Sequence, residues 1–217
     1  MRILVTGGAG FIGSHVIKKL LQQEENVVFN IDKMGYASNP YILDELIKQN
    51  SSISTNQYKF LNIDLASKSE TENAVEEAKP NLIMHLAAES HVDRSIDGPE
   101  EFIKSNILGT YNLLEAARKY WSKLNTDNKQ TFRFQHISTD EVFGSLGESG
   151  SFSEETPYDP RSPYSASKAS SDHLVKAWFH TYKLPIVLTN CSNNYGPWQF
   201  PEKLIPLVIF KANQNKK

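Results

Sequence analysis

Residues 3–15, ILVTGGAGFIGSH, decide the fold of this chain. An apolar run leads into a cluster of glycines, in which Gly8, Gly10 and Gly13 form the pattern G-x-G-x-x-G and Gly7 begins an overlapping G-x-x-G-x-x-G. Glycine suits such a turn because the turn is tight, the backbone must approach a pyrophosphate closely, and the following helix packs closely on the strand. The helix N-terminus then offers free N–H groups to the phosphates. The segment therefore predicts a dinucleotide-binding site.

A second strand is expected to end on Asp32, 19 residues after Gly13. A carboxylate there accepts hydrogen bonds from the adenosine ribose and repels a 2′-phosphate, which favours NAD over NADP. Lys33, the next residue, weakens that preference. The alternative is a structural glycine turn with an aspartate cap, but the strand, turn and helix context favours the dinucleotide site.

Short apolar runs alternate with helix-length amphipathic stretches along most of the chain, a pattern typical of a parallel sheet covered by helices. Several runs are continuously apolar, as buried parallel strands are. We therefore predict an α/β fold with a doubly wound parallel sheet, the NAD-binding Rossmann fold. The expected strands are 2–5, 27–31, 58–62, 82–86, 132–137 and 186–189, and the expected helices lie near 11–23, 69–78, 100–121 and 163–182.

The composition excludes several classes of protein. The 217 residues are 39% hydrophobic and 22% charged, as in an ordinary globular chain with one sizeable domain, or one domain and part of a second. The 23 basic and 25 acidic residues leave a net charge of −2, so we expect no nucleic-acid partner. No run approaches the roughly 18 apolar residues of a membrane span. A single cysteine, Cys191, and glycines too early for a signal peptide make the cytoplasm the expected location.

The segment 136–144, HISTDEVFG, follows the fifth expected strand and carries hydroxyl and carboxyl groups. Ligands in open α/β sheets bind at the carboxyl ends of strands, so Thr139, Asp140 and Glu141 are candidate catalytic residues. Neighbouring carboxylates suit an elimination, because one can be held protonated as an acid while the other stays ionised as a base. The alternative is a turn in which Ser138, Thr139 and Asp140 cap a following helix, and the motif alone favours that interpretation.

Tyr164 and Lys168 stand four residues apart, just after Pro163, which suits the first turn of a helix. At that spacing both side chains lie on one helical face. A tyrosine has an ordinary pKa of about 10, too high for a base at neutral pH, and a nearby ammonium stabilises the phenolate. The pair could then remove a proton from a sugar or alcohol hydroxyl while hydride leaves for a nicotinamide. Alone the pair is weak evidence, but together with a dinucleotide motif it indicates an oxidoreductase.

Three further segments carry structural expectations. The stretch 100–121 predicts a helix with two apolar faces, which packs on its own sheet and on another subunit, or else within one large core. Segment 144–163 is rich in Gly, Ser, Glu and Pro and is expected to be a functional loop beside the candidate chemistry. Segment 49–57 is expected to be a surface loop. The first apolar face consists of Ile103, Ile107, Thr110, Leu114, Ala117 and Trp121, and the second of Phe102, Leu108, Tyr111 and Leu113.

Five segments together resemble a known family. They are ILVTGGAGFIGSH at 3–15, MHLAAESHVDRSI at 84–96, HISTDEVFG at 136–144, SPYSASKASSDHLVKAW at 162–178 and TNCSNNYGPWQFPEKLIPLVI at 189–209. On these segments the chain is similar to the extended short-chain dehydrogenase/reductases and, more closely, to the dTDP-glucose 4,6-dehydratases of rhamnose and related deoxysugar pathways. The match extends over nearly the whole chain.

The resemblance implies a reaction and a set of roles. Tyr164, supported by Lys168, takes the proton of the hydroxyl on sugar carbon 4 as NAD accepts the hydride, and Thr139 hydrogen-bonds that hydroxyl. Glu141 then removes the proton at carbon 5, and Asp140 protonates the leaving hydroxyl at carbon 6. The hydride returns to carbon 6 and a proton returns to carbon 5. The product is a 4-keto-6-deoxy sugar, with no net redox change.

The motifs and the resemblance together assign binding residues. The expected NAD-binding residues are Gly7, Gly10, Phe11, Ile12, Gly13, Asp32, Lys33, Asp64, Leu65, Leu86, Ala87, Ala88, Ser90, Ser105, Tyr164, Lys168 and Asn194. The expected residues for the substrate, dTDP-glucose, are Ser90, Thr139, Asn193, Lys203 and Leu204. Phe143 stands where the family commonly has a tyrosine, which is expected to remove a hydroxyl near the acid/base pair. No metal is expected, because His85, His91 and His136 lack metal-ligand spacing.

Residues 1–190 are expected to form the NAD-binding domain with the catalytic residues, and 191–217 the start of an incomplete substrate-binding portion, because members of the family continue well beyond this length. We expect a homodimer, and we expect NAD binding to survive this length better than turnover does. The alternatives are a UDP-glucose 4,6-dehydratase, a nucleotide-sugar 4-epimerase, which needs no elimination pair, and a non-catalytic dinucleotide-binding module.

Overall fold

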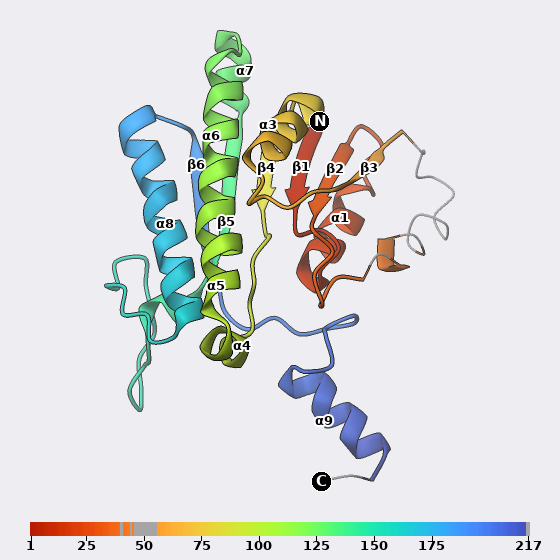
Figure 1. Ribbon diagram of the computed structural model, residues 1–217, viewed down its shortest axis with the longest axis vertical. Helices are drawn as coiled ribbons and strands as arrows, with labels where there is room; N and C mark the ends of the chain where they lie inside the picture. The colour runs from red at the N-terminus through yellow and green to blue at the C-terminus, as the bar shows by residue number, and fades with distance from the viewer. Residues whose placement is uncertain (40, 44, 46–55, 216–217) are drawn as a thin grey trace.

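The structure, a computed structural model, describes residues 1–39, 41–43, 45 and 56–215. Within these residues, parallel strands form a six-stranded sheet in the order β3-β2-β1-β4-β5-β6, which is that of a doubly wound sheet (Figure 1). The predicted fold class is therefore confirmed, and each predicted strand is present with ends shifted by at most two residues. The strands are β1 (Arg2–Thr6), β2 (Val27–Asp32), β3 (Tyr58–Asn62), β4 (Leu82–His85), β5 (Arg133–Thr139) and β6 (Ile186–Cys191).

The connections between the strands contain helices. The predicted helices near 11–23, 69–78 and 163–182 are present. Among the described residues, α4, α7 and α9 are additional: α4 and α7 are too short to show apolar periodicity, and α9 begins with a continuous apolar run. The helical elements are α1 (Phe11–Leu20), α3 (Lys68–Ala78), α4 (Val92–Asp97), α5 (Pro99–Phe102), the π turn η1 (Ile103–Leu108), α6 (Gly109–Ser122), α7 (Thr126–Thr131), the 3₁₀ turn η2 (Asp140–Phe143), α8 (Pro163–Tyr182) and α9 (Leu204–Asn213). Most of the expected surface loop, residues 49–55, lies outside the described residues.

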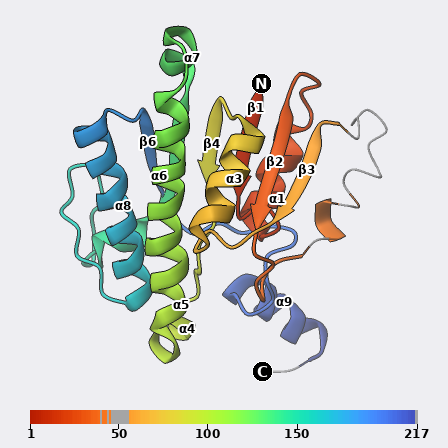
Figure 2. The same ribbon diagram turned by 45° about the horizontal axis from the view of Figure 1, so that its top comes forward.

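Different helices cover the two faces of the sheet because side chains alternate along each strand. Leu4 belongs to the larger core cluster, to which α3, α6 and α8 contribute, and this cluster also holds Phe134 of β5. Ile3 and Val5 belong to the second cluster, which contains Ile17 of α1. Figures 1 and 2 show α3, α6 and α8 side by side across one face of the sheet. The core thus has two layers with the sheet between them.

The N-terminus of α8 is defined by a capping box. The side chain of Ser162 accepts the N–H of Ser165, and the side chain of Ser165 accepts the N–H of Ser162. Pro163 occupies the first helical turn, as predicted, where its missing N–H costs no hydrogen bond. This start places Tyr164 in the first turn and Lys168 one turn later.

The predicted helix over 100–121 contains a π turn, η1, between α5 and α6. A π turn holds more residues than an α-helical turn and therefore rotates the apolar stripe that precedes it. Ile103, at the start of the first apolar face, is 54% exposed in the single chain, whereas Thr110, Leu114 and Ala117 of the same face are buried. Phe102 and Leu113 of the second set are buried, whereas Leu108 and Tyr111 remain exposed.

The irregular segment 144–162, which was expected to be a functional loop, does not line the cleft described below. Its aromatic residues instead pack on Phe143, whose ring lies 5.3 Å from that of Phe152 and 5.2 Å from that of Tyr158. Phe143 is therefore buried in a small apolar cluster.

Replacing a phenylalanine in the larger core cluster should destabilise the protein. Phe134 on β5 is fully buried, so Phe134→Ala should reduce the free energy of unfolding by about 3–5 kcal/mol. Phe60 on β3 is 38% exposed, and Phe60→Ala is the matched control, with an expected loss of roughly 1 kcal/mol or less. Denaturant unfolding of both variants checks this, and equal losses would contradict the placement of the core.

Candidate active site

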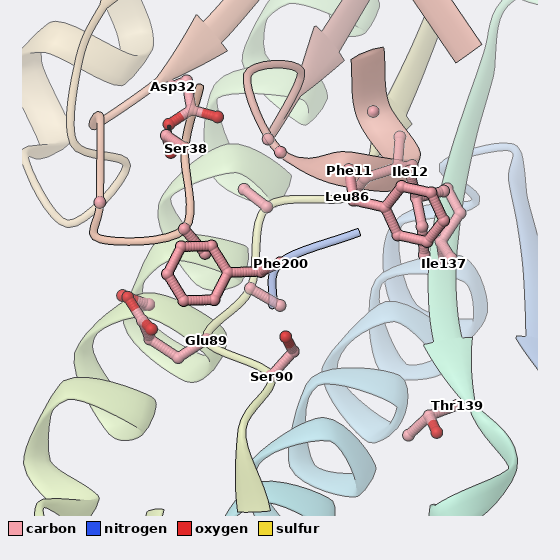
Figure 3. Close-up of a pocket in the computed structure, with 18 of the residues that line it drawn as sticks. Phe11, Ile12, Asp32, Ser38, Leu86, Glu89, Ser90, Ile137, Thr139 and Phe200 are labelled. Carbon is pink, nitrogen blue, oxygen red and sulfur yellow. Dashed lines mark hydrogen bonds between the residues drawn. The ribbon is translucent and has the colours of Figure 1, made fainter. Parts of the chain in front are cut away.

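The carboxyl ends of the strands border a cleft of about 350 Å³. Figure 3 shows Asp32 and Ser38 at one end of this cleft, Thr139 at the other, and Phe200 between them. The cleft lies at the edge where the order of strands reverses, between β1 and β4, which is where open α/β sheets bind ligands. Its volume is in the range of small-molecule sites.

The turn between β1 and α1 has the steric properties that a dinucleotide cradle needs. Gly7 has a φ of +74°, and a Cβ there would lie 2.7 Å from the backbone of Ala87. A Cβ at Gly13 would lie 2.2 Å from the carbonyl oxygen of Gly7. Helix α1 begins after Gly10 with no side-chain cap and no acidic residue in its first turn. The turn and the uncapped helix terminus therefore fit a pyrophosphate.

Asp32 joins this turn to the end of β2. Its Oδ2 accepts the backbone N–H of Ala9 at 3.0 Å. Its Oδ1 accepts the N–H of Met34 at 2.8 Å and the hydroxyl of Ser38 at 2.9 Å. Asp32 is 7% exposed and lines the cleft, so its carboxylate is fixed in place at the end of the cleft where the ribose of a dinucleotide is predicted.

Tyr164 and Lys168 both line the cleft from the first two turns of α8, as their spacing predicts. The Nζ ammonium of Lys168 donates a hydrogen bond to the carbonyl oxygen of Ile137 at 2.8 Å. Burial lowers the pKa of Lys168 to about 8, and the carboxylate of Asp172 opposes this. Lys168 is therefore a buried cation at the floor of the cleft.

The pKa of Tyr164 is shifted in the direction opposite to the predicted one. Burial raises this pKa above its ordinary value, the Glu141 carboxylate adds to the rise, and the hydroxyl of Thr139 opposes it. The ammonium of Lys168 is directed at the Ile137 carbonyl and is not among the main influences on this pKa. Burial and the nearby carboxylates outweigh the predicted stabilisation of the phenolate.

The segment after β5 combines a helix cap with acidic side chains. Oγ1 of Thr139 accepts the N–H of Glu141 at 3.2 Å, so the capped turn considered as an alternative is present. Thr139 and Glu141 nevertheless line the cleft, so the cap and a candidate site coexist. Burial and the neighbouring Asp140 raise the pKa of Glu141, and Lys203 opposes this. Asp140 accepts a hydrogen bond from Thr139 at 3.3 Å but does not line the cleft.

A buried polar cluster, which we did not predict, lies beneath the lysine. Asp172 accepts hydrogen bonds from Ser138 at 2.8 Å and Tyr158 at 2.9 Å, and its Oδ1 lies 3.0 Å from Nε2 of His136. Burial alone would raise the pKa of Asp172, but His136, Ser138 and Lys168 lower it overall. Asp172 and His136 are both fully buried. Asp172 therefore provides a buried negative charge one helical turn from Lys168.

The segment before α9 is attached to the rim of the cleft by Glu202. Its Oε1 accepts the hydroxyl of Tyr36 at 2.9 Å, and its Oε2 lies 3.3 Å from Nε of Arg94 and 3.7 Å from Nε2 of His91. Lys203 donates a hydrogen bond to the carbonyl oxygen of Ser90 at 3.3 Å. These contacts bring residues of the C-terminal part into the same cleft as the glycine turn.

Nearly all of the predicted site residues lie together. Every residue predicted to bind NAD, from Gly7 to Asn194, lines the cleft, as do Asn193 and Lys203. Asp140 does not, and Leu204, the first residue of α9, is 75% exposed and lies outside it. Some residues that line the cleft were not predicted, because they lie far along the chain from the recognised motifs or only beside the key positions of those motifs. They include Tyr36, Ser38, Glu89, Ser138, Phe200 and Glu202.

Two negative findings concern the described residues alone. Among them, no group of three or more histidine, cysteine, aspartate or glutamate side chains is arranged to hold a metal ion. In the same part of the chain, no helix combines the length and the apolar character that a membrane crossing requires.

Comparison with known proteins decides the family. The chain matches the family model described as GDP-mannose 4,6 dehydratase over residues 4–217. The chain belongs to this family. The glycine turn, Thr139 to Glu141 and the Tyr164 and Lys168 pair all lie within the matched residues.

Similar proteins are longer than this chain. It is 54% identical to the dTDP-glucose 4,6-dehydratase of Salmonella typhimurium, an alignment that covers 100% of this chain and 61% of that protein. The structure of a dTDP-glucose 4,6-dehydratase of Streptomyces venezuelae with NAD bound is 40% identical, with a TM-score of 0.86, over 99% of this chain and 63% of that one. A UDP-glucose 4-epimerase of Thermus thermophilus complexed with NAD is 32% identical, with a TM-score of 0.80, over 98% of this chain and 61% of that one.

The buried histidines should make stability depend on pH. Burial, with the charge of Lys168, lowers the pKa of His136 to about 4, and burial, with His136, lowers that of His85. Both rings are neutral when folded, so their contribution is complete above about pH 6.5 and declines as the unfolded chain takes up protons below that pH. The free energy of unfolding should therefore fall by roughly 2 kcal/mol per histidine between pH 7 and pH 5.

Denaturant unfolding at several pH values measures this slope. His136→Asn should flatten it, whereas His180→Asn, at an exposed position, is the control that should leave it unchanged. An equal slope in the wild type and in His136→Asn would show that His136 is not neutral in the folded protein.

Proposed function

We propose that this chain is the dinucleotide-binding and catalytic part of an NAD-dependent dTDP-glucose 4,6-dehydratase, a hydro-lyase. The observation that carries the proposal is the meeting of Thr139, Glu141, Tyr164 and Lys168 in the cleft that also contains the glycine turn. The names of the Salmonella and Streptomyces relatives support the choice of dTDP-glucose as substrate. Deoxysugar synthesis, as for rhamnose, is the corresponding pathway.

NAD fits the cleft on the chain's own geometry. The uncapped N-terminus of α1 faces the pyrophosphate position, and the fixed carboxylate of Asp32 would accept the ribose hydroxyls. Tyr164 and Lys168 would hold the nicotinamide end, at the far side of the cleft. When bound, NAD supplies the acceptor and later the donor of a hydride.

The residues of the chain would then move protons. Tyr164 takes the proton from the hydroxyl on carbon 4, and Thr139 orients that hydroxyl. Because carbon 5 is acidified by the resulting ketone, Glu141 removes its proton, a task that its raised pKa suits. Asp140 gives a proton to the hydroxyl leaving carbon 6, so that water is lost, and a proton returns to carbon 5 when carbon 6 is reduced. Lys168 donates to the ribose hydroxyls and stabilises the charge that develops on Tyr164.

A UDP-glucose 4,6-dehydratase and a nucleotide-sugar 4-epimerase are the competing enzymes. Two observations favour an epimerase. The chain is similar to the Thermus epimerase, and Asp140 does not line the cleft, whereas an epimerase needs no elimination pair. The exposure of Glu141 to the cleft, with a carboxyl whose pKa is raised, favours the dehydratase. A non-catalytic dinucleotide-binding module is the remaining alternative.

The proposal includes a division into domains and a location. Residues 1–190 form the NAD-binding domain, and 191–217 begin the substrate-binding portion, in keeping with the contacts of Asn193 and Lys203 with the cleft. A cytoplasmic location is in keeping with a single, unpaired cysteine, Cys191.

The proposed partner is a second copy of the chain. Helices α6 and α8 lie side by side on the outside of the molecule (Figure 2), and large apolar side chains are exposed on both helices and on the turn η1 that precedes α6. The exposed fractions are 41% for Leu108, 37% for Tyr111, 43% for Phe179 and 43% for Tyr182. A face of this kind on two adjacent helices suits a symmetric dimer.

Removal of the proposed base tests the function. The purified chain is incubated with dTDP-glucose and NAD, and the 4-keto-6-deoxy product and enzyme-bound NADH are measured. Glu141→Gln should reduce product formation by about 10²–10⁴-fold while NADH still forms, because the base acts after hydride transfer. Glu148→Gln, at an exposed position, is the control. Undiminished product in Glu141→Gln would exclude Glu141, and a 4-epimer as product would identify an epimerase.

A charge placed on the exposed face tests the dimer. Leu108→Glu should shift the protein from dimer to monomer in sedimentation velocity, because a carboxylate would be buried without a partner at the interface. Leu146→Glu, at a leucine that is 47% exposed on segment 144–162, should not. A monomeric wild type at micromolar concentration would contradict the proposed partner.

A further inference from the structure

Lys33 and Glu89 form an ion pair inside the cleft. Nζ of Lys33 lies 2.9 Å from Oε1 of Glu89 and donates a hydrogen bond to Oγ of Ser105 at 2.7 Å. The two charged side chains are 29% and 17% exposed. Glu101 is farther away, at 3.9 Å, and is 61% exposed. Glu89 is therefore the principal counter-charge of Lys33, in a charge-assisted contact more protected than a surface pair.

The π turn η1 holds both members of this pair in place. Asn106 on this turn is 1% exposed, and its Oδ1 accepts the N–H of Glu89 at 2.8 Å while its Nδ2 donates to the carbonyl oxygen of Glu89 at 3.0 Å. Nδ2 also donates to Ser167 on α8 at 2.8 Å. Ser105, which binds the ammonium, is the preceding residue on the same turn. The carboxylate of Glu89 is thus carried on a backbone that is fixed on both sides, and π turns are frequent at functional sites.

The position of this ion pair affects which dinucleotide the cleft can bind. Lys33 follows Asp32 directly, and Asp32 is the carboxylate proposed to accept the ribose hydroxyls. A free cation beside this position would attract a 2′-phosphate, as a nearby arginine does in NADP-binding sites. The ammonium of Lys33 is instead neutralised by Glu89, so a 2′-phosphate would meet the negative charge of Asp32 without a compensating cation.

We propose that Glu89 is a specificity-determining residue, which makes the cleft select NAD over NADP by holding Lys33 in an ion pair. The inference rests on the proposed function, because that function places a dinucleotide in this cleft. It assigns discrimination between NAD and NADP to an ion pair between the segments that follow β2 and β4, in addition to Asp32 itself.

Titration calorimetry with NAD⁺ and NADP⁺ on the full chain tests the inference, and the ratio of the two dissociation constants is the readout. Glu89→Gln frees the ammonium and should shift this ratio about tenfold toward NADP⁺. Lys33→Met leaves the carboxylate of Glu89 uncompensated and should shift the ratio toward NAD⁺. Glu101→Gln is the matched control and should leave the ratio within about twofold of the wild type. Added salt should reduce the shifts.

The outcomes separate the inference from the proposed function. An unchanged ratio in Glu89→Gln, with NAD⁺ still bound, would overturn the inference alone. A wild-type chain that binds neither dinucleotide would overturn both. Should Glu89→Gln fail to fold, Lys33→Met decides, because a ratio that is unchanged or moves toward NADP⁺ in that variant would overturn the inference.

Discussion

The hydrogen bond from the N–H of Ala9 to the carboxylate of Asp32 is the contact on which the cleft depends. It joins the turn after β1 to the end of β2, and the same carboxylate also holds the following segment through Met34 and Ser38. The turn can approach the segment that follows β4 only because Gly7 has no Cβ, and α1 can pack against the turn only because Gly13 has none. With the turn fixed, the uncapped terminus of α1 points into the cleft. One carboxylate therefore sets both the shape of the cradle and its charge.

The features that sequence reasoning found are those whose physical cause is local. Continuous apolar runs located the strands, because buried parallel strands need apolar side chains on both faces. The glycine pattern and Asp32 were recognisable because turn sterics and strand spacing operate within about 30 residues. Pro163 and the four-residue spacing of Tyr164 and Lys168 located the start of α8 and its face toward the cleft.

The features that it missed depend on contacts between distant parts of the chain. The π turn is one example, since Asn106 bonds Glu89 and Ser167, 17 and 61 residues away, and no local pattern records such partners. Glu202 contacts Arg94 across 108 residues. The direction of the pKa shift of Tyr164 is a third example. Helical spacing places Lys168 on the correct face of α8, but it does not show that the ammonium donates a hydrogen bond to the Ile137 carbonyl.

The buried cluster around Asp172 explains how the cleft retains a lysine that is only 4% exposed. Burial of Lys168 away from water disfavours its charged form, and the negative charge of Asp172 offsets part of that cost. Asp172 is itself buried, and it keeps its charge because Ser138, Tyr158 and His136 supply polar contacts. His136 stays neutral because it is buried and because Lys168 lies nearby, so a second positive charge does not compete for Asp172. Apolar residues could fill this volume and hold the sheet and α8 together equally well. Only the polar cluster, however, keeps a cation at the floor of the cleft; an apolar core would not.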